Sequence, residues 1–354
     1  MKHILAINPG STSTKVAFYA DREEVFVKTL DHPVEEIQKY DHVQDQFDFR
    51  KNVIMDLLKE NGVELETLSA VVGRGGMLPP VESGAYKVND IMVDRLKNRP
   101  VAEHASNLGA LIAYEIAEGL GIPAYIYDSV AVDEMEDIAR ISGMPLIPRV
   151  SFSHSLNSRA MAHKVAEKYG KKYAEMNFVV AHLGGGISVS VHKHGRMLDI
   201  ISDDEGPFSP ERAGRVPCNN LIDLCFSGEY DKRVVKKMMR GKGGITAYLG
   251  TVDAREVEKM IAEGNKEAKT VYEAMAYQVA KGIGELSTVL CGKVDAIILT
   301  GGIAYSKMMT DWISARVSFI APVEVMAGEN ELESLAYGAL RVLCGEEEAK
   351  TYTE

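Results

Sequence analysis

The feature of this sequence that most constrains its fold is a pattern that occurs twice, half a chain apart. Residues 4–19 read ILAINPGSTSTKVAFY, and residues 178–192 read FVVAHLGGGISVSVH. In both stretches a hydrophobic strand leads into a small polar turn that contains glycine, and a second strand follows. The repeat predicts two domains of the same plan that face one another, with both turns at the cleft. Independent coincidence is the alternative.

The rest of the chain alternates predicted strands and helices, which is typical of a layered α/β protein. Hydrophobic spacing and glycine stops predict helices over residues 47–61, 104–119, 153–170 and 332–343, with one or two more over 255–290. Short strands are expected over residues 68–76, 124–128 and 294–302, and an exposed acidic tail is expected after the last helix.

The same pattern predicts the domain boundaries. We expect a first domain over residues 1–149, joined by a C-terminal segment of about 332–354, and a second domain over 150–331. The last helix is expected to cross back onto the first domain. Domain closure over a ligand would then use a hinge near residues 149–151.

The overall composition excludes several classes of protein. The chain has 354 residues, enough for two domains, and its formal net charge of -11 argues against a nucleic-acid surface. No apolar run reaches the length of a membrane span, and the N-terminal apolar stretch is too short for a signal peptide. The cysteines form no CxxC pair and predict reduced thiols in a cytoplasmic protein; they are Cys218, Cys225, Cys291 and Cys344.

The first polar turn can bind phosphate although the common nucleotide motifs are absent. The chain has no GxxxxGK[ST] and no GxGxxG after a strand, and it also lacks HExxH and GxSxG. In NPGSTSTK, Gly10 permits a tight turn, and the amides and hydroxyls of residues 11–14 can donate to phosphate oxygens. Lys15 adds a compact positive charge, and Asn8 can hold a metal-bound water or the γ-phosphate. A solvated hairpin rich in serine and threonine is the alternative for this segment alone.

The second polar turn strengthens the prediction of a phosphate site. Three consecutive glycines in HLGGG destabilise a strand but allow the backbone to approach a ligand closely. His182 stands beside them, which favours a functional role over a packed or surface histidine. His192 and His194 lie at an expected hairpin tip with Lys193, and we expect both to be exposed.

Other residues at predicted strand ends complete the set. LTGGIA, with Gly301–Gly302, would let a flat ring lie against the backbone, as an adenine does. Arg74 lies in GRGG, and Arg212 and Arg215 lie in the loop GPFSPERAGRVP; arginine forks match carboxylate and phosphate oxygens. Asp128 ends the strand YIYD and suits Mg²⁺, usually through water. Each alone could be a surface ion pair, but together they predict a phosphoryl-transfer cleft.

The order of these motifs resembles the acetate and butyrate kinases, within the superfamily of sugar kinases, heat-shock chaperones and actin. The matching segments cover essentially the whole chain: NPGSTSTK, GRGG, EHASN, YDSVAVDEM, AHLGGGIS, EGPFSPERAGRVP, LTGGIAYS and ENELESLAYGAL. GPFSPER and GRGGML look closest to the butyrate branch. The resemblance implies two duplicated ribonuclease-H-like domains with ATP in the cleft between them. It also implies reversible transfer of the γ-phosphoryl group to a carboxylate, which gives an acyl phosphate and ADP.

The resemblance assigns roles to individual residues. Those implied for the nucleotide are Asn8, Ser11, Ser13, Lys15, Gly184, Gly185, Gly186, Gly301 and Gly302. Those implied for the acid and the transferred group are Arg74, His104, Asp128, His182 and Arg212, with Arg215 open as the second clamp arginine. Those implied for Mg²⁺, through water, are Asn8, Asp128 and Glu331. The family also implies a homodimer or larger closed assembly, with no nucleic-acid or membrane partner.

The chemistry of the reaction agrees with these roles. A carboxylic acid is already ionised at neutral pH, so the site needs no strong general base. It must instead bring two anions together, which arginines, Mg²⁺ and a histidine achieve electrostatically. We therefore expect Asp128 to organise the metal and the geometry, not to accept a proton.

Two positions suggest the length of the acid. Ala181 stands where acetate kinases carry phenylalanine, and Gly75 and Gly76 follow Arg74 where those enzymes have valines. Both changes would enlarge the pocket, so we expect butyrate or isobutyrate to be preferred over acetate. Propionate, acetate or branched-chain acid kinases of the same mechanism are alternatives. A nucleotide switch like actin or the chaperones is the alternative from another class, although it has no use for a carboxylate clamp.

Overall fold

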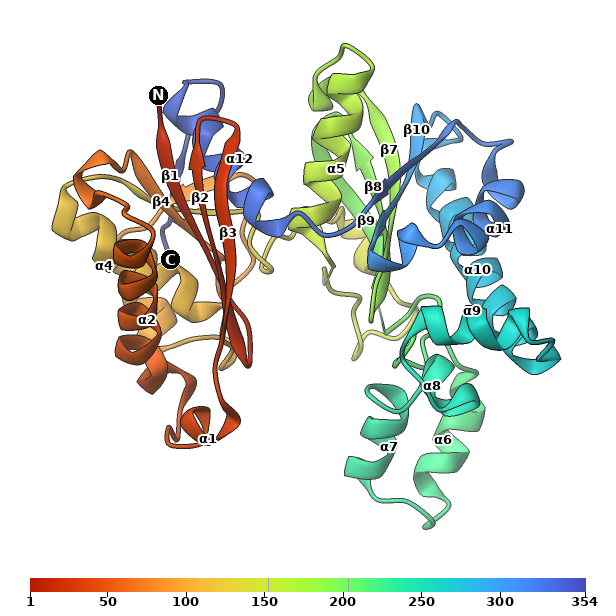
Figure 1. Cartoon of the computed structure of the whole chain (residues 1–354). Coiled ribbons are helices and arrows are strands. Elements are labelled where there is room, and N and C mark those ends of the chain that lie inside the picture. Colours follow the sequence, from red (N-terminus) through yellow and green to blue (C-terminus); the bar gives the residue numbers. More distant parts are fainter. Residues whose placement is uncertain (152, 203) are drawn as a thin grey trace. The chain divides into compact units, whose positions relative to one another are not determined.

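The computed structural model describes residues 1–151, 153–202 and 204–354, which form two compact units (Figure 1). Unit 1 comprises residues 1–133 and 330–354, and unit 2 comprises residues 134–329. None of the described helices is long and apolar enough to cross a membrane.

The first boundary between the units lies ahead of the expected hinge near residue 149. The segment after it is bonded to unit 2, because the Glu136 amide donates to the Leu198 carbonyl at 3.0 Å. Arg149 then pairs with Asp199, its Nη1 lying 3.1 Å from the carboxylate. Residues 134–149 are therefore held by unit 2.

Unit 1 is built on a seven-stranded sheet of order β12-β5-β6-β4-β1-β2-β3. The strands are β1 His3–Pro9, β2 Ser13–Ala20, β3 Glu23–Asp31, β4 Ala70–Gly73, β5 Ala85–Lys87, β6 Ala124–Tyr127 and β12 Lys350–Thr351. β1, β2 and β3 form an antiparallel meander, while β4 runs parallel to β1 and β6 parallel to β4. Strand β1 is central because its residues 4–7 are fully buried and need cover on both faces.

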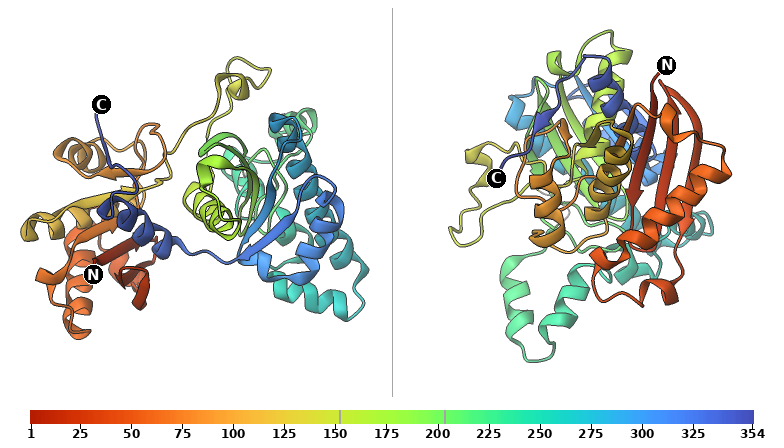
Figure 2. Two further views of the ribbon diagram at one scale, coloured as in Figure 1. Left: turned by 90° about the horizontal axis from the view of Figure 1, so that it is seen from above. Right: turned by 90° about the vertical axis from the view of Figure 1, so that its left-hand side faces the viewer.

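The helices of unit 1 supply that cover. They are α1 Val34–Ile37, α2 Phe47–Glu60, α3 Asp90–Asn98, α4 Asn107–Leu120 and α12 Glu331–Leu343. Helix α4 packs on β4 and β6, and α12 packs on β1, β4 and β6 (Figure 2). The tail after α12 exposes Glu346, Glu348 and Glu354 as expected, but it is also anchored, because β12 pairs with β5 and Tyr352 is only 3% exposed.

Unit 2 repeats the plan in a five-stranded sheet of order β11-β10-β7-β8-β9. Its strands are β7 Asn177–Leu183, β8 Ile187–Lys193, β9 Arg196–Ile201, β10 Ala296–Gly301 and β11 Val323–Ala327. β7, β8 and β9 form an antiparallel meander, and β10 is parallel to both β7 and β11. The order therefore corresponds to β6-β4-β1-β2-β3 of unit 1, which confirms the prediction of two duplicated α/β domains.

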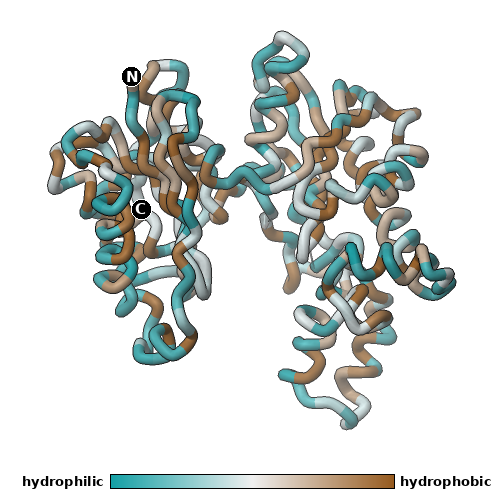
Figure 3. Tube along the Cα trace, viewed as in Figure 1, coloured by the Kyte–Doolittle hydropathy of each residue, from teal (hydrophilic) through white to brown (hydrophobic). Residues whose placement is uncertain are grey.

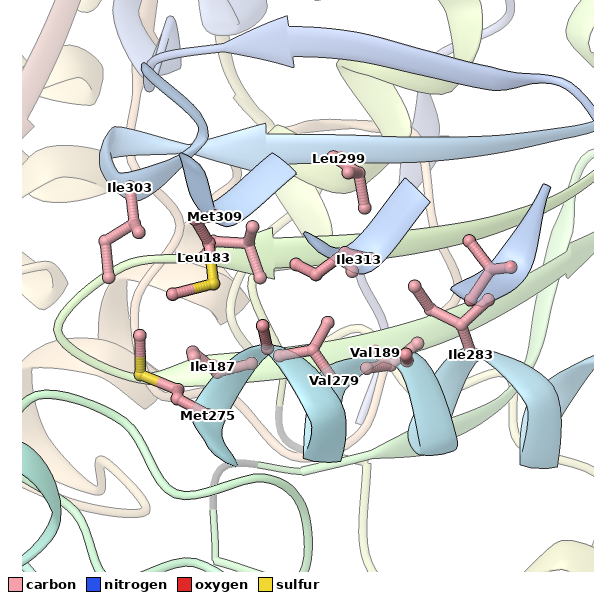
Figure 4. Packing of buried hydrophobic residues seen from close by; sticks show 14 of the residues in the cluster. Leu183, Ile187, Val189, Met275, Val279, Ile283, Leu299, Ile303, Met309 and Ile313 are labelled. Carbon is pink, nitrogen blue, oxygen red and sulfur yellow. The ribbon is translucent and has the colours of Figure 1, made fainter. Parts of the chain in front are cut away.

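The helices of unit 2 surround this sheet, which has a large hydrophobic cluster on one face and a smaller one, built with the first of these helices, on the other. They are α5 Ser155–Lys168, α6 Cys218–Phe226, α7 Lys232–Met239, α8 Gly244–Leu249, α9 Ala254–Ala262, α10 Lys266–Ser287 and α11 Lys307–Val317. Figure 4 shows Val279 and Ile283 of α10 and Ile313 of α11 against side chains of β7, β8 and β10. The predicted 255–290 helix is two helices, because Gly264 adopts a φ of +93° and Asn265 caps α10.

Hydropathy follows this layering within each unit. In Figure 3 hydrophobic stretches lie along the strands, and hydrophilic ones lie at many of the loops. The four cysteines are free and exposed, in accord with the expected reduced thiols.

His192 was predicted to be exposed, but its side chain is buried. It is 0% exposed, and its ring bonds to the Tyr173 hydroxyl at 2.7 Å and to the Ser190 hydroxyl at 2.8 Å.

The expected exposure of His192 is therefore wrong, and its cause is the position of the turn. The β8–β9 turn is made by His194 and Gly195, so His192 lies inside the strand, whereas His194 is exposed as predicted. Burial lowers the pKa of His192 to about 3, with a smaller contribution from the charge of Arg159. The ring is neutral at pH 7.

Candidate active site

A cavity of about 380 Å³ lies at the carboxyl end of β1 in unit 1. The parallel strands β1 and β4 end side by side, with Ile7 opposite Gly73, so that Asn8 and Arg74 emerge at the same edge of the sheet. The β1–β2 turn forms one wall and the first residue of α12 closes another. Seven residues predicted for the site line this cavity: Asn8, Ser11, Ser13, Lys15, Arg74, His104 and Glu331.

Glu331 joins two of these side chains. Its carboxylate accepts from Asn8 Nδ2 at 2.5 Å and from Arg74 Nη1 at 2.5 Å. Burial alone would raise the pKa of Glu331, but the charge of Arg74 and the hydrogen bonds outweigh it and lower the pKa. The Arg74 side chain is 13% exposed, and its guanidinium already binds a carboxylate inside the cavity.

His104 presents a neutral donor to the same cavity. The Ser106 amide donates to its Nδ1 at 3.2 Å, which leaves the proton on Nε2. Shielding from water and the charge of Arg74 both lower the pKa of His104. Its ring is therefore uncharged at pH 7 and can donate one hydrogen bond from Nε2.

Asp128 is not among the residues that line this cavity. Its side chain is buried and Oδ1 accepts from the Gly84 amide at 2.8 Å. Its φ of +40° is unusual for a residue other than glycine, and such strain is common at functional sites. Asn8 donates to Glu331 inside the cavity, whereas the printed contact of the Asp128 carboxylate is with the Gly84 amide.

In unit 2, His182 stands at the end of β7 inside a polar network. Asn157 Nδ2 lies 3.0 Å from its Nδ1 and donates to Thr300 Oγ1 at 3.0 Å. Glu329 Oε1 lies 3.1 Å from His182 Nε2. The ring of His154 stacks on the ring of His182, with centroids 3.9 Å apart and planes inclined by 6°.

His154, Asn157 and Glu329 were not among the residues predicted for the site. A usable signal was present, because His154 and Asn157 are three residues apart at the start of α5 and thus share one face. Glu329 is the first residue of the matching segment ENELESLAYGAL, but its approach to His182 depends on how the β11–α12 segment folds.

The β7–β8 turn keeps its backbone open. Gly185 is exposed, and Ser209 Oγ donates to its carbonyl at 2.6 Å, so the loop that carries Arg212 supports the turn. Gly301 is required by packing, because its φ is +89° and a Cβ would lie 2.4 Å from the Leu183 carbonyl oxygen. A Cβ on Gly302 would meet no atom within 4 Å, so the surface of this glycine can meet a ligand.

The two candidate clamp arginines differ in their surroundings. Arg215 is exposed and its Nη1 lies 3.2 Å from the carboxylate of Glu285. Arg212 is half-buried, and burial together with the charge of Arg240 lowers its pKa to about 10. Arg212 is thus the less exposed of the two arginines, and a charge shielded from water attracts an anion more strongly.

The pocket argument for acid length is not supported by the structure. Ala181 is fully buried in the hydrophobic cluster of unit 2, on the strand face opposite to the adjacent His182. A Cβ on Gly75 would lie 2.3 Å from Ser129 Cβ, and one on Gly76 would lie 2.5 Å from Asn107 Oδ1. These glycines allow close packing and do not open a pocket.

Comparison with known proteins identifies the family. The model of the acetokinase family matches residues 148–326. Butyrate kinase 1 of Clostridium acetobutylicum is 54% identical over 354 residues, which cover 99% of this chain and 100% of that protein. Butyrate kinase 2 of the same organism is 51% identical over 351 residues, 99% of both chains. The chain belongs to the acetokinase family.

Membership makes the chain a kinase, and it confirms the resemblance found in the sequence. The acetokinase family uses ATP as its phosphoryl donor. Among solved structures, the acetate kinase of Porphyromonas gingivalis superposes with a TM-score of 0.80 over 97% of this chain and 100% of that chain. At 19% identity, that likeness establishes the shared two-domain fold.

Proposed function

We propose that this acetokinase transfers the γ-phosphoryl group of ATP to the carboxylate of a short-chain acid, with butyrate or isobutyrate preferred, and that it catalyses the reverse reaction. The observation that carries the proposal is the Arg74 guanidinium at the cavity wall, which already holds a carboxylate at 2.5 Å. The preference for a four-carbon acid rests on the similarity to the two clostridial butyrate kinases.

The acid binds by replacing Glu331 on Arg74. The two carboxylates compete for the same guanidinium, and the substrate can form the paired hydrogen bonds that an arginine fork favours. His104 donates from Nε2 and so fixes the orientation of the bound acid. The released Glu331 keeps its hydrogen bond from Asn8.

The chemical step requires no proton transfer. A carboxylate oxygen forms a bond to the γ-phosphorus, and the bond from that phosphorus to the β,γ-bridging oxygen breaks, with its electron pair leaving on ADP. Ser11, Ser13 and Lys15 of unit 1 stabilise phosphate oxygens, and we assign His182 and Arg212 of unit 2 to the transferring group. Gly184–Gly186 and Gly302 are assigned to the nucleotide.

The cavity wall fits a hydrated Mg²⁺. Such an ion, when bound with ATP, neutralises phosphate charge and keeps several of its waters. Asn8 and Glu331 carry the oxygen donors that would hold it, and both line the cavity. Asp128 accepts from the Gly84 amide and shapes the end of β6.

A homodimer remains part of the proposal, and light scattering on the purified protein would test it.

A hydroxamate-trapping assay with ATP, Mg²⁺ and acids of two to five carbons tests the proposal. We expect kcat/KM to be highest with butyrate or isobutyrate. An equal or higher value with acetate or propionate would refute the preference but keep the acyl kinase. ATP hydrolysis that no carboxylic acid stimulates, without acyl phosphate, would refute the function and favour a nucleotide switch.

A further inference from the structure

Arg50 of α2 is buried directly against the β1–β2 turn. Its side chain is 1% exposed and is one of the largest completely buried side chains of the molecule. Nη1 donates to the carbonyls of Gly10 at 2.8 Å and Ser13 at 3.1 Å, and Nη2 donates to the carbonyl of Ser11 at 3.0 Å. One guanidinium thus binds three carbonyls of the predicted phosphate turn.

All other contacts of this guanidinium are also to uncharged acceptors. Nη1 donates to Thr14 Oγ1 at 3.1 Å, and Nε and Nη2 donate to Gln46 Oε1 at 3.0 and 2.8 Å. Among the residues that the structure describes, no carboxylate forms an ion pair with Arg50. Burial lowers its pKa to about 10, so the side chain is still charged at pH 7. A positive charge without a protein counter-ion therefore lies behind the turn.

The hydrogen bonds of the turn engage its backbone carbonyls and leave two of its backbone amides available to a ligand. Arg50 occupies the carbonyls of Gly10, Ser11 and Ser13, and the His32 amide donates to the carbonyl of Thr12 at 2.8 Å. The amides of Ser11 and Thr12 donate to no acceptor in the described part of the chain, and both residues lie at the surface of the turn. A turn whose carbonyls are engaged and whose amides and hydroxyls are available is complementary to an anion.

We propose that Arg50 is a positioning residue for the phosphates of ATP. It holds the carbonyls of the turn away from the ligand, and its uncompensated charge favours an anion on the other side of the same backbone. Arg50 does not line the cavity, so it acts through the turn and does not touch the substrate. The inference rests on the proposed function, because it names what positions the turn toward ATP.

Charge explains why an arginine is used here. A buried charge without a partner is costly, whereas an uncharged donor could satisfy the same carbonyls at lower cost. The cost falls when a phosphate binds nearby, because charges interact strongly where water is excluded. Anion binding and the stability of the turn are therefore coupled through Arg50.

Two substitutions separate the geometry of Arg50 from its charge. Arg50→Lys keeps the charge but loses the planar fork that reaches three carbonyls. Arg50→Met loses both and keeps much of the volume. Lys51→Met is the matched control, because Lys51 is the next residue of α2 and pairs with Glu115, away from the turn. It removes the same charge from the same helix.

We expect KM for ATP to rise about 10- to 100-fold in Arg50→Met, and less in Arg50→Lys, with KM for the acid nearly unchanged. Inorganic phosphate and ADP should raise the Tm of the wild type and of Lys51→Met. The same ligands should raise the Tm of Arg50→Met much less. Equal KM for ATP and equal ligand-induced Tm shifts in a folded Arg50→Met protein would overturn the proposal.

Two further outcomes also test the positioning role: a variant that does not fold, and a wild type that phosphorylates no acid. If Arg50→Met does not fold, Arg50→Lys decides, and an unchanged KM for ATP with an unchanged phosphate-induced Tm shift would refute the positioning role. If the wild type phosphorylates no acid, the proposed function fails. An Arg50-dependent stabilisation by phosphate would in that case still support the inference, because the Tm measurement does not depend on turnover.

Discussion

The β1–β2 turn and the β7–β8 turn occupy the same place in two sheets of corresponding strand order, but their residues differ in kind. The first turn carries hydroxyls and Lys15, and the charged Arg50 is buried behind it. The second turn is three glycines, and the groups behind it are the side chains of His182 and Asn157. Topology thus determines where the two turns lie, while their residues make the first turn polar and charged and the second an open glycine backbone.

The largest effect is expected in the loop that supports the second turn. Arg212→Gln should lower kcat/KM for the acid about 100- to 1000-fold, because one charged donor to the developing transition-state charge is lost. Arg215→Gln, which breaks the pair with Glu285 and the hydrogen bond to the Glu205 carbonyl, should change it less than about threefold. Steady-state kinetics on both variants checks this. A larger loss in Arg215→Gln would reverse the assignment of the second clamp arginine.

A second prediction concerns the glycines next to the β7–β8 turn. Gly301→Ala should lower the free energy of unfolding by about 1–3 kcal/mol, since alanine disfavours a φ of +89° and its Cβ would meet the Leu183 carbonyl. Gly302→Ala should leave stability nearly unchanged but raise KM for ATP. Urea unfolding and ATP kinetics distinguish the two glycines. Equal destabilisation by both would show that neither is reserved for the nucleotide.

A third prediction concerns the pH dependence of stability that arises from buried histidines in the two units. The pKa of His192 is about 3 when folded and ordinarily about 6.5, so its contribution to stability is complete above pH 6.5 and is lost as the pH falls toward 3. His32, buried in unit 1, adds a loss in the same direction because its folded pKa is about 4. Arg50 stays charged throughout this range.

His192→Gln should therefore reduce the fall in Tm between pH 6.5 and 4, while costing about 1–3 kcal/mol at pH 7 through lost hydrogen bonds. His194→Gln, at the exposed turn, is the control and should change neither quantity. Differential scanning calorimetry across this pH range measures both. A His192→Gln variant with the wild-type pH profile would exclude His192 as a source of acid sensitivity.

The sequence predicted what depends on local pattern, and it failed where tertiary packing decides. The two turns and their strands were predictable because period-2 alternation and glycine are local signals. Ala181 was expected to enlarge the acyl pocket because acetate kinases carry phenylalanine there, but its side chain lies in the core, on the strand face opposite to His182. Asp128 was expected among the metal donors because it ends a strand, and its bond to the Gly84 amide had no local signal in the sequence.

Arg50 shows most clearly what local patterns cannot predict. Nothing in FDFRKNVIMDLL distinguishes it from an ordinary charged residue of an amphipathic helix. Its role appears only when α2 packs on the β1–β2 turn, 37 to 40 positions earlier in the chain. Contacts made through folding carry no local signal, so the residue behind a binding turn is harder to predict than the turn itself.

The smallest effect is expected for Lys15, whose charge lies at the surface of the first turn, whereas the charge of Arg50 is buried behind it. Lys15 is exposed and lines the cavity, so water weakens its attraction for phosphate. Lys15→Met should raise KM for ATP about tenfold or less at low salt, and the difference should shrink as salt is added, with KM for the acid unchanged. Lys28→Met, on the exposed β3, removes an equal charge outside the cavity and should have no effect. The defect of Arg50→Met should persist in salt because that charge is buried. Equal salt dependence of the Lys15 and Arg50 variants would mean that both charges act through solvent, and the distinction drawn between the two positions would be lost.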